Sequence, residues 1–264
     1  MDVTRVPVPT DTRAPVDWTC AYLLGSDPAV LVDPAATSDH LDAAVDDRTV
    51  SAIAVTHHHP DHVGAVAHYA DRTGATVYCR AGRERLFRHA AGTPPDDSLR
   101  AGDALPADDG TVTVLDTPGH APEHIAFAAG TDVVTGDLVV ADGSVVVGAP
   151  EGDMRAYLTS LRRLHARAPG CFLPAHGPVV DEPRAACARL IAHRLDRERR
   201  VRAAVRAGAR TPDEILDQAY DRDLAGVRDL ARATVIAHLE KLAVEATVEW
   251  DGSRAVPTDE SERA

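Results

Sequence analysis

The segment Thr56–His62 constrains this chain more than any other, because it reads Thr-His-His-His-Pro-Asp-His. It follows Val50–Val55, an apolar run that predicts a buried strand. Residues two apart in an extended turn project from the same side, so His57 and His59 should face one space. The pair Asp61-His62 opens the next helix and should face that space too. Imidazole nitrogen and carboxylate oxygen are the ligands that zinc prefers, with iron or manganese as alternatives.

A histidine-rich surface turn that binds metal only adventitiously is the alternative for this segment taken alone. Three further ligand-type residues argue against that reading, because each follows a predicted strand: His120, Asp137 and His176. Strand ends are where α/β folds gather their sites. The candidate metal site therefore comprises seven residues: His57, His59, Asp61, His62, His120, Asp137 and His176.

Apolar runs separated by turn signals alternate with helical patterns through the first two-thirds of the chain. The run Gly25–Pro28 lies between two apolar segments and predicts a β-hairpin. Helical spacing predicts helices over Val63–Tyr69 and Met154–Leu164. This alternation indicates an α/β fold, a layered sandwich. The expected strands are Thr19–Leu24, Ala29–Val32, Val50–Val55, Ala75–Cys79, Thr111–Leu115, Ile125–Ala128 and Val133–Thr135.

The pattern changes after His176-Gly177-Pro178, so we expect a catalytic domain at residues 1–180 and a helical domain at residues 181–264. Three helices followed by a two-stranded wing predict a winged-helix-like C-terminal domain. The polar tail from Thr258 should be frayed. The expected helices are about Arg184–Ala207, Thr211–Tyr220 and Leu230–Leu242, and the expected wing strands are Thr247–Trp250 and Ala255–Val256.

The H-x-H-x-D-H motif, with the later His120, Asp137 and His176, resembles the metallo-β-lactamase superfamily in its hydroxyacylglutathione hydrolase style. The resemblance implies an αββα sandwich with the site at one edge, between the two sheets. It implies one metal ion on His57, His59 and His120. It implies a second on Asp61, His62 and His176, with Asp137 and a water or hydroxide as bridge. Asp61 would also orient the nucleophile, which makes it the expected catalytic residue.

A narrower resemblance rests on Gly177–Val180, Ile191–Arg194 and Arg197-Glu198, followed by the predicted winged helix. These segments resemble the beta-lactamase-like protein 2 branch of the superfamily. The resemblance implies either endoribonuclease activity, as in animal members, or thioesterase activity, as in relatives that act on polyketide carrier proteins. In both cases two divalent metal ions would lower the pKa of a bridging water and so supply hydroxide near neutral pH.

The charge pattern favours an acyl substrate, either a small molecule or one bound to a carrier protein. The formal net charge is −13, and Lys241 is the only lysine, so no obvious track for phosphates is present. Cleavage of single-stranded RNA is the alternative activity, because the arginines of Arg80–Arg88 form a basic stretch. That stretch is either a solvated helix face or a recognition site for an anionic substrate.

The remaining features predict a cytoplasmic protein with no membrane segment, and an oligomer is compatible with the sequence. Residues 1–17 contain no secretory signal, and no apolar run approaches the ~18 residues that a membrane span needs. His58 and His124 should have structural roles beside the metal ligands. The cysteines are far apart and should be buried free thiols in a reducing compartment: Cys20, Cys79, Cys171 and Cys187.

Overall fold

The computed structural model describes residues 1–108, 110–221 and 223–258, so most of the predicted frayed tail lies outside the described residues. The chain forms two compact units. The first unit comprises Met1–Thr117, Glu123–Val145 and Leu164–Ala186, and the second comprises Pro118–Pro122, Val146–Arg163 and Cys187–Ala264. The predicted domain boundary at residue 180 stays a prediction.

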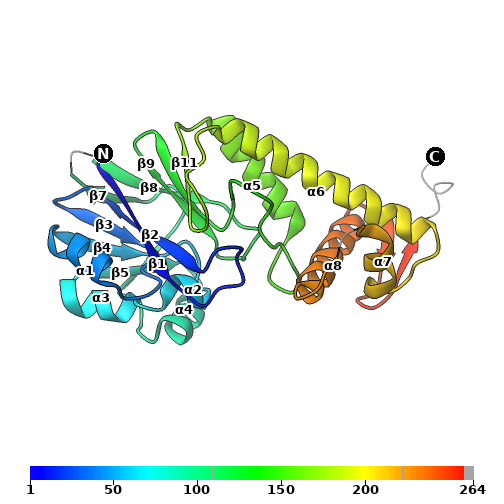
Figure 1. Cartoon of the computed structure of the whole chain (residues 1–264), viewed down its shortest axis with the longest axis horizontal. Helices are drawn as coiled ribbons and strands as arrows, with labels where there is room; N and C mark the ends of the chain where they lie inside the picture. Colours follow the sequence, from blue (N-terminus) through cyan, green and yellow to red (C-terminus); the bar gives the residue numbers. More distant parts are fainter. Residues whose placement is uncertain (109, 222, 259–264) are drawn as a thin grey trace. The chain divides into compact units, whose positions relative to one another are not determined.

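A six-stranded sheet in the order β1-β2-β3-β4-β5-β6 forms one layer of the first unit (Figure 1). Strands β1 to β3 are antiparallel, and β3 to β6 are parallel. The predicted hairpin is confirmed, because Tyr22 pairs with Val32 across β2 and β3. The strands are β1 (Val3–Pro9), β2 (Trp18–Leu24), β3 (Ala29–Val32), β4 (Val50–Ala54), β5 (Thr76–Arg80) and β6 (Asp97–Leu99).

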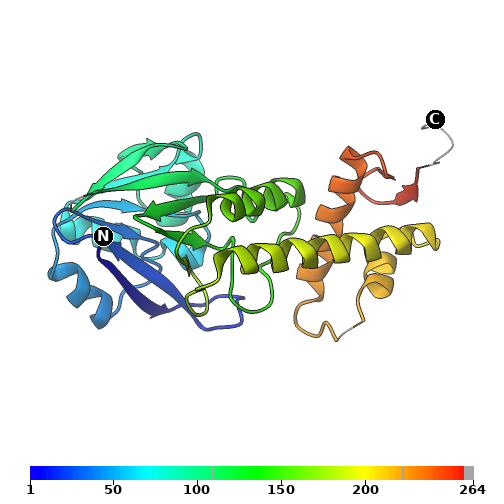
Figure 2. The ribbon, with the colours of Figure 1, turned by 90° about the horizontal axis from the view of Figure 1, so that it is seen from above.

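A five-stranded sheet in the order β11-β10-β9-β8-β7 packs on the first one (Figure 2). Buried side chains of both sheets form a shared core, with Tyr22 and Val30 from one sheet and Val112 and Phe127 from the other. All neighbours in this sheet are antiparallel except β10 and β11. Its strands are β7 (Ala104–Ala107), β8 (Gly110–Asp116), β9 (Ile125–Ala129), β10 (Asp132–Gly136) and β11 (Phe172–Pro174).

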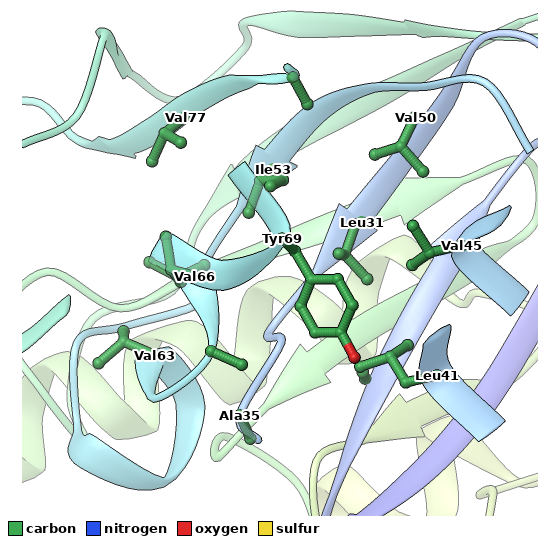
Figure 3. Packing of buried hydrophobic residues seen from close by; sticks show 14 of the residues in the cluster. Leu31, Ala35, Leu41, Val45, Val50, Ile53, Val63, Val66, Tyr69 and Val77 are labelled. Atoms are coloured by element: carbon green, nitrogen blue, oxygen red, sulfur yellow. The ribbon is translucent and has the colours of Figure 1, made fainter. Parts of the chain in front are cut away.

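Helices cover the other face of the six-stranded sheet (Figure 3). Leu31 and Ile53 from the sheet pack against Leu41 of α1 and Tyr69 of α3. Each such apolar side chain contributes about 1.5–3 kcal/mol when it is fully buried. The helices of this part are α1 (Asp39–Asp46), α2 (Pro60–Val63), α3 (Val66–Thr73) and α4 (Glu84–Ala91).

The helix predicted over Val63–Tyr69 is divided, because α2 ends at Val63 and α3 begins at Val66. The division lies at Gly64, where a Cβ atom would lie 2.4 Å from the carbonyl oxygen of Ala35. Glycine therefore allows the chain to pass close to the segment that follows β3.

The second unit contains helices and a hairpin. Helices α5 (Met154–Arg167) and α6 (Pro183–Arg206) each contribute residues to both units. In α7 (Pro212–Ala219), Thr211 and Glu214 form a capping box. Helix α8 (Arg228–Val244) precedes the antiparallel pair β12 (Val248–Trp250) and β13 (Ala255–Pro257). These elements agree with the predicted helices and strands, while their assignment as a winged helix stays a prediction.

The cysteines are free thiols, and three of the four are buried. Burial raises the pKa of Cys20 to about 11 and that of Cys187 to about 12. Both thiols are therefore protonated near neutral pH and act as small apolar groups, as the sequence predicts. Within the described ranges, no helix has the length and apolar character needed to cross a membrane.

Candidate metal centre

The candidate ligands of the first unit lie at the carboxyl ends of strands from both sheets. The segment His57–His62 follows β4 of the six-stranded sheet. Asp137 directly follows β10, and His176 follows β11, in the five-stranded sheet. Because β10 and β11 are parallel neighbours, their ends bring these last two side chains to the same edge. The site therefore lies where the two sheets meet.

Short distances connect the residues from the two sheets. The Oδ1 atom of Asp137 lies 3.3 Å from His176 Nε2 and 3.6 Å from His62 Nε2. Asp61 Oδ2 lies 3.7 Å from His176 Nε2. His57 Nε2 and His59 Nδ1 are 2.9 Å apart. Within the first unit, two groups of possible ligands have donor atoms within 4.8 Å of one another: His57, His62 and Asp137, and Asp61, His62 and His176.

The buried nitrogens of this cluster fit a metal ion. The Nε2 atoms of His62 and His176 are buried and have no hydrogen-bond partner among the described residues. Leaving one such polar atom buried and unsatisfied costs about 1–3 kcal/mol. A divalent cation between imidazole nitrogens and carboxylate oxygens would satisfy these atoms and balance the charge of Asp61 and Asp137.

The opposite nitrogens of the same rings are held by neighbouring groups. Asp33 Oδ2 lies 3.0 Å from His62 Nδ1, and the Trp18 carbonyl oxygen lies 3.0 Å from His176 Nδ1. Thr56 Oγ1 lies 3.1 Å from His57 Nδ1. Such partners fix the ring orientation and leave Nε2 as the nitrogen that faces the centre of the cluster.

Asp33 is a residue of the candidate site that our sequence reasoning missed. Its carboxylate accepts hydrogen bonds from the backbone N–H and the hydroxyl of Thr56, both at 2.7 Å. It is 1% exposed and has a left-handed φ of 51°, which few residues other than glycine, asparagine and aspartate adopt readily. The signal in the sequence was an acidic residue directly after the buried strand Ala29–Val32. Because β3 and β4 are parallel neighbours, that residue lies beside the Thr56 end of β4.

Two carboxylates control the protonation of His62. Burial lowers the pKa of this imidazole, but the negative charges of Asp33 and Asp137 more than compensate and raise it well above its ordinary value. In the metal-free protein His62 therefore holds a proton near neutral pH. A metal ion must displace this proton when it binds.

His120 lies in the second unit, on the Pro118–Pro122 segment. Its Nδ1 atom lies 2.7 Å from the carbonyl oxygen of Val146. At Gly119, φ is 142° and a Cβ atom would lie 2.3 Å from the Cα atom of Tyr157, so the segment needs glycine beside α5. The role of His120 as a ligand stays a prediction.

His58 and His124 have the structural environments that the sequence predicts. His58 Nδ1 lies 2.9 Å from Oε1 of Glu123, which is buried. His124 Nδ1 lies 2.9 Å from the hydroxyl of Thr117. Burial raises the pKa of Glu123, but His58 outweighs this effect and keeps the pKa below its ordinary value. Glu123 therefore stays ionised and holds the His58 ring.

Known proteins are similar to this chain in sequence. A curated relative from Caenorhabditis elegans, a beta-lactamase-like protein 2 homolog, is 25% identical over 75% of this chain and 66% of its own length. An atrochrysone carboxyl ACP thioesterase from Aspergillus chevalieri is 31% identical over 71% of this chain and 60% of its own length. The chain thus spans 60% to 66% of the length of these two relatives.

Solved structures share the fold. A metallo-beta-lactamase family protein from Thermus thermophilus has a TM-score of 0.78 and 26% identity, covering 97% of this chain and 98% of its own. A protein solved in a di-iron-bound form has a TM-score of 0.54 and 30% identity, covering 69% of this chain and 96% of its own. Residues 19–176, more than half of the chain, match the metallo-beta-lactamase superfamily. The chain belongs to this superfamily.

Proposed function

We propose that this protein is a thioesterase that hydrolyses an acyl thioester or a related ester at a centre of two divalent metal ions. The observation that carries the proposal is the pair of overlapping ligand groups in the first unit, in which the buried Nε2 atoms of His62 and His176 face carboxylates of Asp61 and Asp137. The proposed ligands are His57, His59, Asp61, His62, His120, Asp137 and His176. When bound, the ions supply an activated water near neutral pH and polarise the scissile carbonyl group.

The residues of the chain hold and orient the reactants in this proposal. Asp61 and Asp137 have side chains that are 16% and 14% exposed, so water reaches them while His57, His62 and His176 stay buried. Asp61 accepts a hydrogen bond from the attacking water and so orients it toward the carbonyl carbon. Asp33 and Trp18 keep the His62 and His176 rings in place during turnover.

The substrate class rests on similarity and on charge. The thioesterase relative at 31% identity is named for a carrier-protein thioester, and the net charge of −13 disfavours an extended polyanion. Zinc is the proposed metal because the ligands are imidazoles and carboxylates. The relative solved in a di-iron-bound form keeps iron as the alternative. The free thiols support a reducing, cytoplasmic location.

An endoribonuclease is the second candidate, because the exposed arginines of α4 could contact phosphates. A parallel assay of metal-loaded protein with acyl thioesters and with single-stranded RNA separates the two activities. We expect thioester turnover that changes little with salt. A nuclease that contacts several phosphates would lose affinity by orders of magnitude between low and physiological salt. Efficient RNA cleavage that is lost in Asp61→Ala, with no thioester turnover, would contradict the proposal.

A further inference from the structure

The outward side of α4 is basic and carries an exposed apolar residue. Arg85, Arg88 and His89 are exposed, and Leu86 is 39% exposed, which is unusual for a leucine of this protein. Among the described residues, the guanidinium groups of Arg83, Arg85 and Arg88 form no ion pair. The helix carries one acidic residue, Glu84, whose carboxylate accepts the Gly82 N–H at 2.8 Å.

Several exposed arginines elsewhere in the chain are neutralised by neighbouring acids. Arg72 lies 2.6 Å from Asp46, and Arg228 lies 2.8 Å from Asp217. Such surface pairs contribute little to stability, but they cancel local positive charge. The arginines of α4 form no such pair with described residues, so no ion pair cancels their positive charge in a chain whose net charge is −13.

This basic surface lies beside the candidate metal centre within the first unit. Helix α4 contacts α2, the short helix that carries Asp61 and His62. Arg83 and the buried Phe87 line a small pocket together with His57 and His58. A molecule bound to the outside of α4 would therefore be held next to the ligand segment.

We propose that the α4 face, formed by Arg83, Arg85, Leu86, Arg88 and His89, docks an acidic carrier protein that delivers its acyl thioester to the metal centre. This inference rests on the proposed thioesterase function. The face is a helix of eight residues, about 12 Å long, and matches one acidic helix of a compact partner better than an extended nucleic acid. An exposed leucine among arginines also suits a protein partner, since protein interfaces combine an apolar centre with charged edges.

The test compares two charge reversals of equal size in metal-loaded protein. R85E/R88E changes the α4 face, and R162E/R163E changes two exposed arginines of α5 that form no ion pair with other described residues. The probes are an acetyl-loaded bacterial acyl carrier protein, which is acidic, and the acetyl thioester of N-acetylcysteamine, which is small and neutral. Thermal melts check that both variants fold.

We expect R85E/R88E to lower kcat/KM for the carrier-bound thioester about 10-fold or more, because steering and docking are lost. The α5 variant should stay within about 3-fold of the parent, and both variants should hydrolyse the small thioester normally. Raising the salt from about 0.05 M to about 0.5 M should lower turnover of the carrier-bound substrate alone. L86A should also reduce kcat/KM for the carrier-bound substrate alone.

Each other outcome contradicts the proposal in a distinct way. Equal losses in the α4 and α5 variants would show a general charge effect, and the same kcat/KM for both substrates in the parent would show that no docking occurs. RNA cleavage that depends on Arg85 and Arg88 would assign the surface to nucleic acid. If the parent hydrolyses neither thioester, the proposed function fails and the docking surface fails with it.

Discussion

Each unit of the molecule buries a cluster of histidine and carboxylate side chains, and the two clusters obtain their positive charge differently. In the second unit, Glu198 lies 2.7 Å from the ammonium group of Lys241 and 3.4 Å from His238 Nδ1. In the first unit, the imidazole of His62 lies between Asp33 and Asp137, at 3.0 Å and 3.6 Å from their carboxylates.

The difference distinguishes a structural cluster from a functional one. Glu198 finds its counterion within the chain, so α6 and α8 are joined by a completed ion pair. The carboxylates of the first unit instead face histidine nitrogens that lack other partners. Buried charge is tolerated only when it is compensated, so the first cluster needs either a proton, as on His62 in the metal-free protein, or a metal cation. The predictions below test this distinction, beginning with the largest effect.

Replacing Asp61 by alanine should lower the rate of hydrolysis about 10²-fold or more, because a ligand and the orienter of water are removed together. The melting temperature of metal-loaded protein should change little, since Asp61 lies at the partly exposed mouth of the site. Steady-state kinetics and thermal melts measure the two effects, and Asp47→Ala on the exposed end of α1 is the control. Activity within a few-fold of the parent would place Asp61 outside the reaction.

Asp33→Asn should weaken metal binding about 10-fold to 100-fold, because the charged partner of His62 is lost while the shape of the side chain is kept. Asparagine also tolerates the left-handed backbone at this position. Competition with a chromophoric chelator measures the affinity, with Asp47→Asn as the matched control. Unchanged affinity would mean that Asp33 supports the fold but not the metal centre.

Lys241→Met should destabilise the second unit by about 2 kcal/mol, because Glu198 keeps its charge but loses its counterion. This cost is smaller than for a fully buried pair, because the Glu198 side chain is 13% exposed. The metal content should not change. Each unit contains one tryptophan, so urea unfolding followed by Trp250 fluorescence in a Trp18→Phe background reports the second unit. Adding Glu198→Gln should restore part of the loss, and a lowered metal content would contradict the separation of roles.

The two clusters should respond to pH with opposite signs. Burial lowers the pKa of His238 despite the nearby Glu198, so this residue stabilises the folded state above its unfolded pKa of 6.5 and the stability is lost as the pH falls. The pKa of His62 in metal-free protein is raised, so its stabilisation is present below 6.5 and is lost as the pH rises.

Between about pH 7.5 and 5.5, the free energy of unfolding of each unit should change by at most ~1.4 kcal/mol per pH unit, the limit for one proton. Urea unfolding at several pH values, with Trp18 or Trp250 as the single fluorophore, measures the two slopes in metal-free protein. His238→Gln should flatten the slope of the second unit. Slopes of the same sign in the two units would contradict our account of the buried charges.

The sequence predicted the elements with clear periodicity and missed those with mixed signals. Strand β1 was missed because Pro7 and Pro9 disfavour a strand, yet β1 pairs only with β2 at the sheet edge, where proline is tolerated. Six of the seven candidate ligands could be placed together in the first unit because they follow strands. Asp33 could not, since its role depends on the parallel pairing of β3 with β4 and on a buried contact 23 residues away.

The ligands of the first unit come from both sheets and extend from His57 to His176 in the sequence. During synthesis, these candidate ligands are all present only after residue 176 has emerged from the ribosome. A metal ion held by this set would bind after one sheet has closed on the other, and it would tie the two sheets together. Loss of such an ion from a mature molecule would accordingly loosen the contact between the sheets first.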